Sequence, residues 1–330
     1  MNVLVAGGVF RHTAAELAAR QPAPEVVLVK GLRDHGIKVS AWPLERWREA
    51  AIAPGFDVVH IHHLSKAALA VAMSPKSRPF VFTEHASGPA ENSVHRVAQK
   101  IVMARASTVV CLSPNEADHK SSAYGIPRSR IEVIPNGIPA PAKADGIRTH
   151  APGEEFRLIF VGQLKEVKQV DRALKALVDL PKNVVLRLVY HNNELEETLR
   201  AQADALGLQG RVSFVGQLSD TALFDEYRKA HALVLPSASE ALPSVVTEAL
   251  LTGLPIIASD VGGVSGQMAD AGILLSPSRS QRIAPAISEL IIQYGKYTER
   301  AAIRAGQVTV DYSVDSMISR HVALYRRLAR

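Results

Sequence analysis

The chain has 330 residues, of which 47% are hydrophobic and 21% are charged. This length predicts about two domains, and the composition excludes a disordered protein because it is apolar enough to build a large core. Cys111 is the only cysteine, so the chain cannot form an intramolecular disulfide, and we expect a reducing, cytoplasmic compartment. The first residues lack the basic segment of a signal peptide, and no apolar run approaches the roughly 18 residues that a membrane span needs.

The net charge of +6 lies entirely in the first half of the chain. Residues 1–150 hold 18 Lys and Arg against 12 Asp and Glu, whereas residues 151–330 hold 20 of each. This surplus predicts an anionic acceptor or an anionic membrane surface as the partner of the first half. Ordinary solubility charge is the alternative interpretation.

Short apolar segments rich in Val, Ile and Leu alternate with helical patterns along the whole chain. Nearly continuous hydrophobicity over a few residues is typical of parallel strands that are buried on both faces. The repeated strand–helix order therefore predicts an α/β fold with two doubly wound parallel sheets. The predicted strands are residues 2–6, 38–42, 57–62, 79–83, 107–111 and 130–134, then 156–161, 184–190, 212–215, 232–235, 255–259 and 272–275.

Residues 135–146 contain a cluster of Pro and Gly without periodicity, which predicts a linker. We therefore expect a first Rossmann-like domain over residues 1–142 and a second over residues 143–311. A cleft between two such domains is the default ligand site. Residues 312–330 follow a helical pattern, and we expect this helix to pack back on the first domain. Its basic face is formed by Arg320, Arg326, Arg327 and Arg330.

Two carboxylates, Glu240 and Glu248, lie between the predicted strands 232–235 and 255–259. Glu240 falls in the loop after the first strand, and Glu248 falls inside the helix that follows. Ligands of open α/β sheets bind at the carboxyl ends of strands, where helices begin. A carboxylate at Glu248 can accept hydrogen bonds from both hydroxyls of a ribose, and Glu240 can meet hydroxyls at the other end of the ligand. The alternative interpretation is two solvated surface glutamates.

The start of this helix suits a diphosphate. The first N–H groups of a helix have no partner inside it, so they attract anions. We expect the backbone N–H groups of Leu242, Ser244 and Val245 to hold the diphosphate between the two carboxylates. Pro243 has no N–H to donate and fits a helix start.

A second candidate segment runs from Gly162 to Lys168. Gly162 ends a predicted strand, so backbone can approach a ligand there, and Lys168 can project a positive charge toward a diphosphate. A glycine and a lysine at this spacing are a weak pattern by themselves, and a surface lysine is the alternative interpretation.

A third candidate is His85, which follows the predicted strand 79–83. A histidine at a strand end can hydrogen-bond a sugar hydroxyl or take part in proton transfer. The alternative interpretation is a capped loop histidine.

Two other ligand classes are disfavoured. His60, His62 and His63 have no carboxylate or cysteine nearby at metal-ligand spacing, so we expect no metal. Gly7 and Gly8 follow the first strand without the G-x-G-x-x-G pattern, so we expect no NAD.

Taken together, these residues resemble a known family. Glu240 and Glu248, followed by Gly253, Pro255 and the Gly262-Gly263 pair, are similar to the donor-site signature of the retaining glycosyltransferases of family 4. The resemblance covers nearly the whole chain and implies the GT-B fold, with two Rossmann-like domains facing across a cleft. Other segments that fall in the family's order are 57–60, 83–85, 134–137 and 162–168.

The resemblance implies a role for each candidate residue. Glu248 would hold the donor's ribose, Glu240 would contact the donor sugar, and Lys168 would hold the leaving diphosphate beside Gly162. His85 would touch the sugar near the anomeric carbon. The implied reaction moves a sugar from a nucleotide-diphosphate sugar to a hydroxyl of a glycan, a lipid-linked acceptor or a small molecule. No metal or other cofactor and no nucleic acid is implied.

The two domains would then have different tasks. The second domain would bind the nucleotide sugar and the first would shape the acceptor pocket, with Gly7 and Gly8 allowing the first loop to approach both substrates. The chain departs from the family at Gln163, where an Arg commonly pairs with the diphosphate, and at Gly266, where a Glu is usual. Lys165 could supply the missing charge.

Two alternatives stay open at this point. The chain could bind a nucleotide sugar without transferring it, as a partner subunit, and the neutral Gln163 favours that interpretation. It could also be a GT-B nucleotide-sugar epimerase, which would convert the donor with no acceptor present. The basic tail and the basic first half suggest peripheral contact with an anionic membrane.

Overall fold

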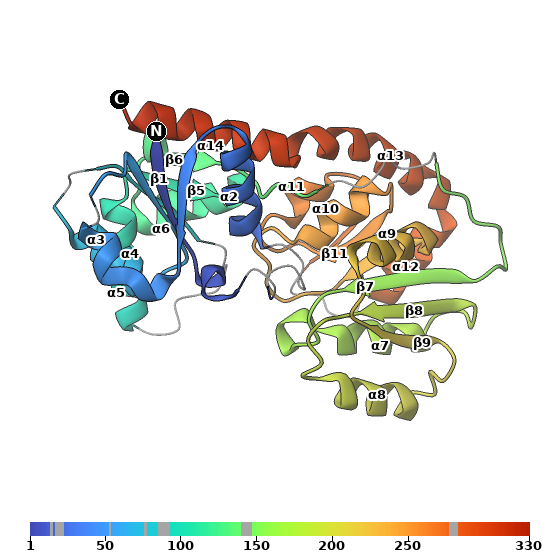
Figure 1. Cartoon of the computed structure of the whole chain (residues 1–330). Helices are drawn as coiled ribbons and strands as arrows, with labels where there is room; N and C mark the ends of the chain where they lie inside the picture. Colours follow the sequence, from blue (N-terminus) through green and yellow to red (C-terminus); the bar gives the residue numbers. More distant parts are fainter. Residues whose placement is uncertain are drawn as a thin grey trace. The chain divides into compact units, whose positions relative to one another are not determined.

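The computed structural model describes residues 1–13, 16, 23–52, 54–75, 78–84, 93–139, 147–276 and 283–330. The chain divides into two compact units (Figure 1). Unit 1 consists of Met1–Pro139 together with Tyr312–Arg330, and unit 2 consists of Ala140–Asp311. Each unit is a parallel sheet between layers of helices, as the doubly wound prediction requires.

Unit 1 is built on a six-stranded parallel sheet with the order β2-β1-β3-β4-β5-β6. Every strand lies within one residue of its predicted bounds at each end, because each is a short apolar run bounded by polar residues, Gly or Pro. The strands are β1 (Asn2–Ala6), β2 (Lys38–Trp42), β3 (Val58–His62), β4 (Phe80–Thr83), β5 (Thr108–Cys111) and β6 (Ile131–Val133).

The side chains of these strands alternate between two separate cores, one on each face of the sheet. On one face, Val3, Val5 and their neighbours pack against α2 and α14. On the other face, Leu4, Ala6 and their neighbours pack against α3 to α6. The helices are α2 (Pro24–Asp34), α3 (Trp47–Ile52), α4 (Lys66–Met73), α5 (Ser93–Arg105), α6 (Pro114–Tyr124) and α14 (Val314–Leu328), and the 3-10 turns are η1 (Gly8–Arg11), η2 (Leu44–Arg46) and η3 (Arg128–Arg130).

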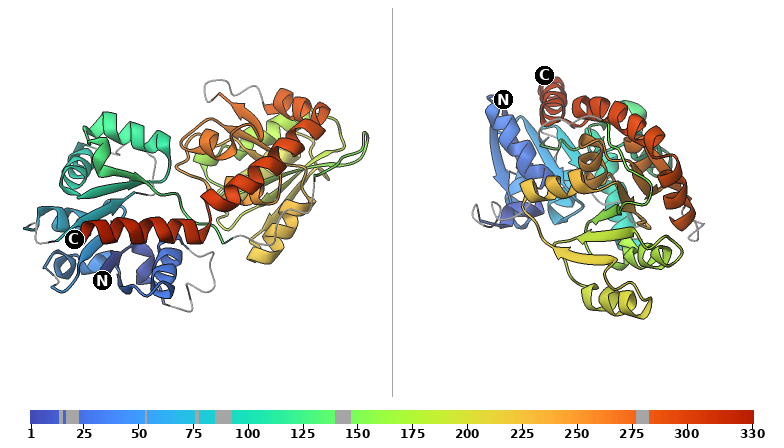
Figure 2. Two further views of the ribbon diagram at one scale, coloured as in Figure 1. Left: turned by 90° about the horizontal axis from the view of Figure 1, so that it is seen from above. Right: turned by 90° about the vertical axis from the view of Figure 1, so that its right-hand side faces the viewer.

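The last helix, α14, packs on unit 1 beside α2 (Figures 1 and 2). The two helices approach closely because Gly31 has no side chain: a Cβ there would lie 2.5 Å from Cγ1 of Ile318. Ile138 forms a parallel bridge with Ser313, so the first part of the predicted linker joins the start of this helical segment. Residues 140–146 of the linker lie outside the described residues.

Unit 2 contains a second six-stranded parallel sheet with the order β12-β11-β10-β7-β8-β9. Its strands also lie within one residue of their predicted bounds: β7 (Phe156–Val161), β8 (Val184–Val189), β9 (Val212–Gly216), β10 (Ala232–Leu235), β11 (Ile256–Ser259) and β12 (Gly272–Leu275). The covering elements are η4 (Glu166–Lys168), α7 (Val170–Val178), α8 (Glu196–Ala205), α9 (Asp220–Lys229), α10 (Ser244–Leu251), α11 (Val264–Met268), α12 (Ile283–Ile292) and α13 (Tyr294–Asp311).

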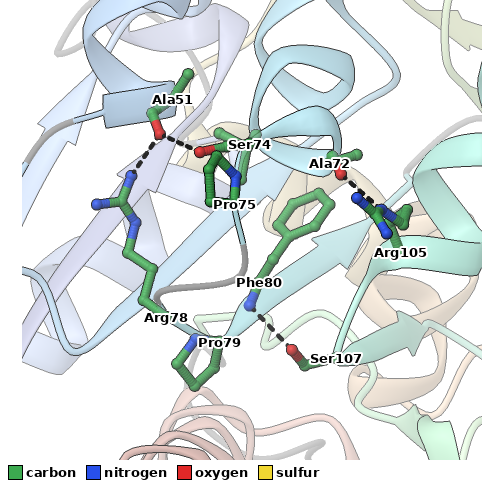
Figure 3. A pocket seen from close by; sticks show the side chains of 10 residues that line it. Ala51, Ala72, Ser74, Pro75, Arg78, Pro79, Phe80, Arg105 and Ser107 are labelled. Atoms are coloured by element: carbon green, nitrogen blue, oxygen red, sulfur yellow. Dashed lines mark hydrogen bonds between the residues drawn. The ribbon is translucent and has the colours of Figure 1, made fainter.

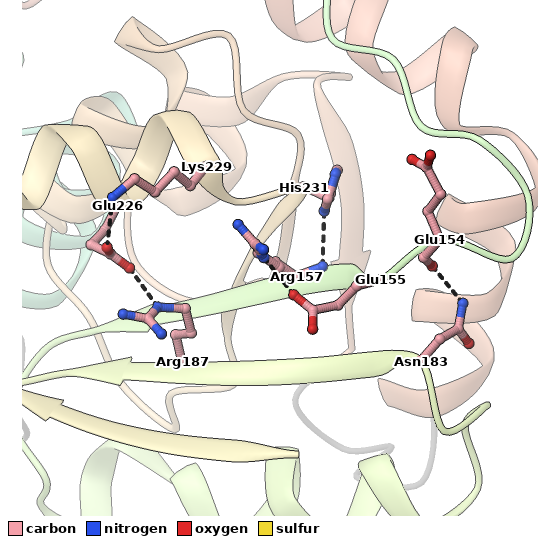
Figure 4. A network of polar contacts seen from close by, with 8 residues as sticks. All are labelled: Glu154, Glu155, Arg157, Asn183, Arg187, Glu226, Lys229 and His231. Carbon is pink, nitrogen blue, oxygen red and sulfur yellow. Dashed lines mark hydrogen bonds and ion pairs between the residues drawn. The ribbon is translucent and has the colours of Figure 1, made fainter. Parts of the chain in front are cut away.

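Polar contacts hold α9 and the start of β10 onto the sheet of unit 2 (Figure 4). Arg187 on β8 pairs with Glu226 on α9. The backbone N–H of Arg157 donates to Nδ1 of His231, at 2.8 Å. Burial, with His150 nearby, lowers the pKa of His231 to about 4, so its ring is neutral in the fold. These contacts fix α9 at the position from which it supplies Tyr227, a residue of the site described below.

Among the described residues, no helix is both long enough and apolar enough to cross a bilayer. In the part of the chain that the structure describes, no group of three or more His, Cys, Asp or Glu side chains is arranged to hold a metal. His60 instead belongs to the core: its ring nitrogens lie 2.6 Å from the hydroxyl of Tyr325 and 2.7 Å from that of Thr83.

Candidate active site

The loops after β7 and β10 form the candidate donor site in unit 2. These strands are neighbours in the sheet, so their carboxyl ends bring the two loops together. The backbone N–H of Ala238, after β10, donates to the carbonyl of Val167, after β7, at 2.8 Å. The two loops that carry the predicted donor residues are therefore joined directly through their main chains.

An ion pair links the same two loops. Nζ of Lys168 lies 2.7 Å from Oε1 of Glu240, and the side chains of the pair are 20% and 8% exposed. Lys168 ends the 3-10 turn η4, and its backbone N–H donates to the carbonyl of Lys165 at 2.9 Å. The structure thus brings together a cation and a carboxylate that are 72 positions apart in the sequence.

The Gly262-Gly263 pair holds the Glu240 loop in place. Gly262 has a φ of 58°, and a Cβ at this position would lie 2.0 Å from the carbonyl oxygen of Glu240. No other residue fits so close an approach. The backbone N–H of Gly263 donates to the carbonyl of Ala241 at 2.7 Å. This glycine pair of the family signature therefore acts on the backbone of the loop that carries Glu240.

The α10 helix begins with donors that suit an anion. Pro243 is the N-cap and forms no side-chain cap hydrogen bond, and the first turn contains no acidic residue. The N–H groups of Ser244 and Val245 open this helix, and the side chain of Leu242 is buried just before it. Nε2 of Gln267 donates to the carbonyl of Pro243 at 3.0 Å, which fixes the helix start.

Glu248 is buried one turn inside α10. It is 7% exposed, and the hydroxyl of Tyr227 donates to its Oε2 at 2.9 Å. Burial raises the pKa of Glu248, and hydrogen bonds from Tyr227 and Ser244 act in the opposite direction. Burial and the nearby Glu248 raise the pKa of Tyr227 well above its usual range. Sequence reasoning missed Tyr227, because its spacing from Leu223 on α9 is that of a core position.

Gln163 follows Gly162 at the end of β7. Its Nε2 lies 3.3 Å from Nε2 of His191, which follows the neighbouring strand β8. Burial lowers the pKa of His191, and the positive charge of Lys165 lowers it further. The charge of Lys165 is therefore felt at the strand end that Gln163 occupies. The backbone N–H of Gly162 donates to the carbonyl of Val189 at 3.1 Å.

In unit 1, the loop after β1 lies beside a buried carboxylate. The backbone N–H of Gly7 donates to the carbonyl of Trp42 at 3.1 Å, and Gly8 begins η1. Glu25, in the first turn of α2, is 3% exposed, and its Oε1 lies 2.9 Å from Nε2 of His63. Sequence reasoning missed this pair, because it considered His63 only as a metal candidate and did not single out Glu25.

His85 lies outside the described residues, but the end of the strand before it is well defined. Glu84 is 6% exposed and accepts a hydrogen bond from Nε2 of Gln99 at 2.8 Å. Nζ of Lys120 lies 3.5 Å from Glu84 and 2.7 Å from Glu116. A buried polar cluster therefore fixes the chain immediately before the predicted histidine.

Comparisons with known proteins identify a family. Residues 4–140 match the family model described as Glycosyltransferase Family 4, and residues 146–307 match the model described as Glycosyl transferases group 1. D-inositol 3-phosphate glycosyltransferase of Mycolicibacterium smegmatis is 29% identical over 306 residues, which covers 84% of this chain and 70% of that protein. The enzyme of the same description from Catenulispora acidiphila is 28% identical over 308 residues, covering 83% and 73%.

Solved structures share the fold over almost the whole chain. The structure of Anabaena HepE in complex with UDP-glucose superposes with a TM-score of 0.75 at 20% identity, covering 99% of this chain and 100% of that one. Sucrose-phosphate synthase from Thermosynechococcus elongatus gives a TM-score of 0.79 at 16% identity and covers 99% of both chains. The predictions of the family, the α/β GT-B fold and the enzyme class are confirmed, and the transferase is favoured over the partner subunit and the epimerase. Two family models that together span most of the sequence, on a shared fold, place this chain among the retaining glycosyltransferases of family 4, which use nucleotide-sugar donors.

Proposed function

We propose that this enzyme transfers a sugar from a UDP-sugar to an acceptor hydroxyl with retention at the anomeric carbon. Unit 2 binds the nucleotide sugar and unit 1 binds the acceptor. The observation that carries the proposal is the Lys168–Glu240 ion pair, whose loop leads into the uncapped start of α10. UDP is chosen because HepE, which shares this fold, was solved with UDP and with UDP-glucose.

Glu248 is the group proposed to hold the ribose. A carboxylate has about four acceptor positions, so the hydrogen bond from Tyr227 leaves capacity for both hydroxyls of a diol. Because Glu248 is almost fully buried, water competes little for its carboxylate, and a hydroxyl pair that reaches it gains hydrogen bonds to a charged group. Tyr227 positions the carboxylate and does not itself contact the ribose in this proposal.

The leaving diphosphate is proposed to meet positive charge from two directions. Nζ of Lys168 supplies a full charge, and the N–H groups of Leu242, Ser244 and Val245 supply dipoles at the start of α10. These groups stabilise the negative charge that develops as the sugar–phosphate bond breaks, and they serve where other transferases use a metal. Gly162 and Gln163 form the backbone edge of the same site.

Glu240 is proposed to have two tasks. Before the donor binds, it holds Lys168 in position through the ion pair. With the donor bound, it accepts hydrogen bonds from sugar hydroxyls while Lys168 turns to the diphosphate. His85 is proposed to contact the sugar near the anomeric carbon, and Gly7 and Gly8 are proposed to let backbone approach the substrates. The acceptor hydroxyl then attacks from the face that the diphosphate leaves.

A donor screen tests this proposal. Thermal unfolding is measured with UDP-, GDP-, ADP- and TDP-sugars, since a ligand that binds only the folded state raises its stability. We expect UDP-sugars to raise Tm and the other nucleotides to have smaller effects. Release of UDP is then followed with acceptors, beginning with D-inositol 3-phosphate because the relatives above are named for it. Unchanged turnover in both Glu248→Ala and Lys168→Ala would refute the site assignment.

We also propose that unit 1 makes peripheral contact with an anionic membrane. The surplus of Lys and Arg over residues 1–150 supports this proposal. The same surplus also suits an anionic acceptor, so charge alone does not locate the contact.

A further inference from the structure

A buried lysine lies between two carboxylates at the carboxyl edge of the sheet in unit 1. Nζ of Lys120, on α6, lies 2.7 Å from Oε1 of Glu116 and 3.5 Å from Oε2 of Glu84. The side chains of Lys120, Glu116 and Glu84 are 5%, 13% and 8% exposed. Burial alone would lower the pKa of Lys120, but the two carboxylates outweigh burial and raise that pKa, so the lysine is charged.

Each carboxylate is tied to the end of a different strand. Glu84 is the residue that follows β4. Glu116 lies in the first turn of α6, and its Oε2 accepts a hydrogen bond from the backbone N–H of Leu112, the residue after β5, at 2.7 Å. Because β4 and β5 are neighbours in the sheet, Lys120 joins the carboxyl ends of two adjacent strands.

Glu84 is held from a second helix as well. Its Oε2 accepts a hydrogen bond from Nε2 of Gln99, on α5, at 2.8 Å. Oε1 of Gln99 in turn accepts one from the hydroxyl of Tyr124, on α6, at 2.6 Å. We call Glu84, Gln99, Glu116, Lys120 and Tyr124 the Lys120 network. Two helices therefore converge on the carboxylate that follows β4.

The same strand end is fixed on the other face of the sheet. The hydroxyl of Thr83, the last residue of β4, lies 2.7 Å from Nε2 of His60, which is fully buried. The backbone N–H of His63 donates to the carbonyl of Thr83 at 2.9 Å. Successive side chains of a strand point to opposite faces, so Thr83 and Glu84 hold the end of β4 from both sides.

Stability alone does not require this network. Taking ions out of water is costly, and replacing a buried ion pair with apolar side chains of similar volume is often neutral or stabilising. The core on this face of the sheet is built of apolar residues, among them Phe82, Met103 and Ala117. Compared with such contacts, a charged and hydrogen-bonded network adds a defined geometry at the strand end.

We propose that Lys120 is a positioning residue for the transfer reaction, which holds the end of β4 in place through Glu84. Ligands of parallel α/β sheets bind at the carboxyl ends of the strands, so the position of this strand end affects substrate binding. The inference rests on the proposed function, in which His85, the next residue of the chain, contacts the donor sugar. Lys120 itself touches no substrate in this proposal.

Release of UDP from UDP-glucose tests the positioning, with and without D-inositol 3-phosphate. Glu84→Gln keeps the size of the side chain and an acceptor for Gln99, but it loses the charge that pairs with Lys120. We expect kcat to fall about tenfold or more, because a small misplacement of a site is costly. The rise in Tm with UDP, which reports nucleotide binding in unit 2, should stay the same.

Glu116→Gln is the matched variant, because it removes the other carboxylate of the same lysine. Its amide oxygen can still accept from the N–H of Leu112, and Glu84 keeps its contacts with Lys120 and Gln99. We expect its kcat to stay within about threefold of the wild type. Equal losses of kcat in Glu84→Gln and Glu116→Gln would overturn the proposal, because the strand end would then have no special part.

Variants of Lys120 separate positioning from stability. Lys120→Met leaves two buried carboxylates without their cation and should lower Tm by about 5 °C or more. Adding Glu84→Gln removes one of these charges, so it should restore much of the lost Tm without restoring kcat. A merely structural lysine predicts that kcat recovers together with Tm, which would refute the positioning role. Lys120→Arg keeps the cation and should retain more of kcat than Lys120→Met.

A control for the anchoring of α5 lies at the opposite edge of the sheet. Nε of Arg105, the last residue of α5, donates to the carbonyl of Ala72 at 3.0 Å. Both residues line a pocket of about 290 Å³, together with Arg78 and Phe80 (Figure 3). Phe80 begins β4, so Arg105→Gln loosens α5 at the far end of the strand that Glu84 follows. It should leave kcat within about twofold of the wild type.

Amide hydrogen exchange tests the strand end without any substrate. Residues 80–84 should exchange faster in Glu84→Gln and Lys120→Met, relative to β1 in the same proteins, and at the wild-type rate in Arg105→Gln. Unchanged exchange at residues 80–84 in all three variants would overturn the proposal. If the wild type released no UDP from UDP-glucose, the proposed donor reaction would fail instead, and exchange would still show whether the Lys120 network fixes the end of β4.

Discussion

Nζ of Lys168 lies 2.7 Å from Oε1 of Glu240, across two loops that follow adjacent strands. The lysine proposed for the diphosphate is thus held by the carboxylate proposed for the sugar. If both groups change partners when the donor binds, as proposed, their contributions to turnover are expected to be coupled.

The first prediction concerns this coupling. We expect Lys168→Met and Glu240→Gln each to lower kcat about a hundredfold, because each removes a group that stabilises charge in the transition state. The kcat of the double variant should fall by much less than the product of the two single reductions, because either change already breaks the ion pair. Steady-state kinetics of the four proteins measure the coupling.

A surface pair provides the control. Lys175 and Asp171 form an exposed ion pair on α7 of the same unit. Lys175→Met and Asp171→Asn should leave kcat within about twofold of the wild type. Strictly multiplicative losses at Lys168 and Glu240 would contradict the proposed coupling.

The second prediction concerns Tyr227. Tyr227→Phe removes the hydroxyl that donates to Glu248 and keeps the ring in the core. We expect KM for the donor to rise up to about tenfold with a smaller change in kcat, because the loss affects the orientation of the ribose ligand. Tyr294→Phe removes another buried hydroxyl of unit 2, bonded to the carbonyl of His231, and should leave KM unchanged. Equal effects of the two variants on KM would argue against a positioning role.

The third prediction addresses the departure at Gln163. Gln163→Arg places a cation beside Gly162, where the diphosphate is proposed to bind. We expect the affinity for UDP to rise about fivefold or more, because an Arg forms charge-assisted hydrogen bonds with phosphate. Gln209→Arg adds the same charge elsewhere in unit 2 and serves as the control. If calorimetry finds no difference between these variants, Lys165 already supplies the charge or the diphosphate lies elsewhere.

The fourth prediction concerns Gly262. An alanine there would place its Cβ 2.0 Å from the carbonyl oxygen of Glu240, at a φ of 58°. We expect Gly262→Ala to lower the free energy of unfolding by about 2 kcal/mol or more and to weaken donor binding. Gly266→Ala, at a helical glycine with no atom within 4 Å of the added Cβ, should stabilise by up to about 1 kcal/mol. Urea unfolding distinguishes these outcomes, and equal stability would show that the loop can move.

The fifth prediction concerns pH. Burial lowers the pKa of His321 to about 4, so the folded protein keeps this ring neutral. In the unfolded chain this histidine binds a proton near pH 6.5. The folded protein therefore loses stability relative to the unfolded chain as the pH falls from about 6.5 to 4. The contribution of His321 to the free energy of unfolding is fully present above about pH 6.5. It falls by about 3 kcal/mol as the pH is lowered to about 4.

His321→Gln removes this titration and keeps a side-chain donor for the carbonyl of Met317. Its stability should depend less on pH between about 6.5 and 4 than that of the wild type. Urea unfolding at several pH values measures the difference. Parallel pH profiles of the two proteins would show that His321 does not titrate in this window.

The sequence predicted the sheets well because their strands are short apolar runs. It could not reveal the Lys168–Glu240 pair, because that contact depends on β7 lying next to β10. The order of strands within a sheet does not follow their order along the chain. Tyr227 was missed for another reason: its hydroxyl is its only polar atom, so its spacing on α9 is that of a core residue. Local patterns identify elements, whereas the contacts of a site depend on how distant elements meet.

Unit 1 is discontinuous, because α14 lies at the end of the chain while the strands that it covers come first. During synthesis, unit 2 is complete before α14 leaves the ribosome. Until then α2 covers only part of the apolar side of the first sheet that includes Val3, Val5 and Val81, and the rest is covered by Ile318 and its neighbours. A chain that is stalled or truncated before α14 therefore exposes apolar surface on unit 1. Chaperones and proteases can recognise incomplete copies by that surface.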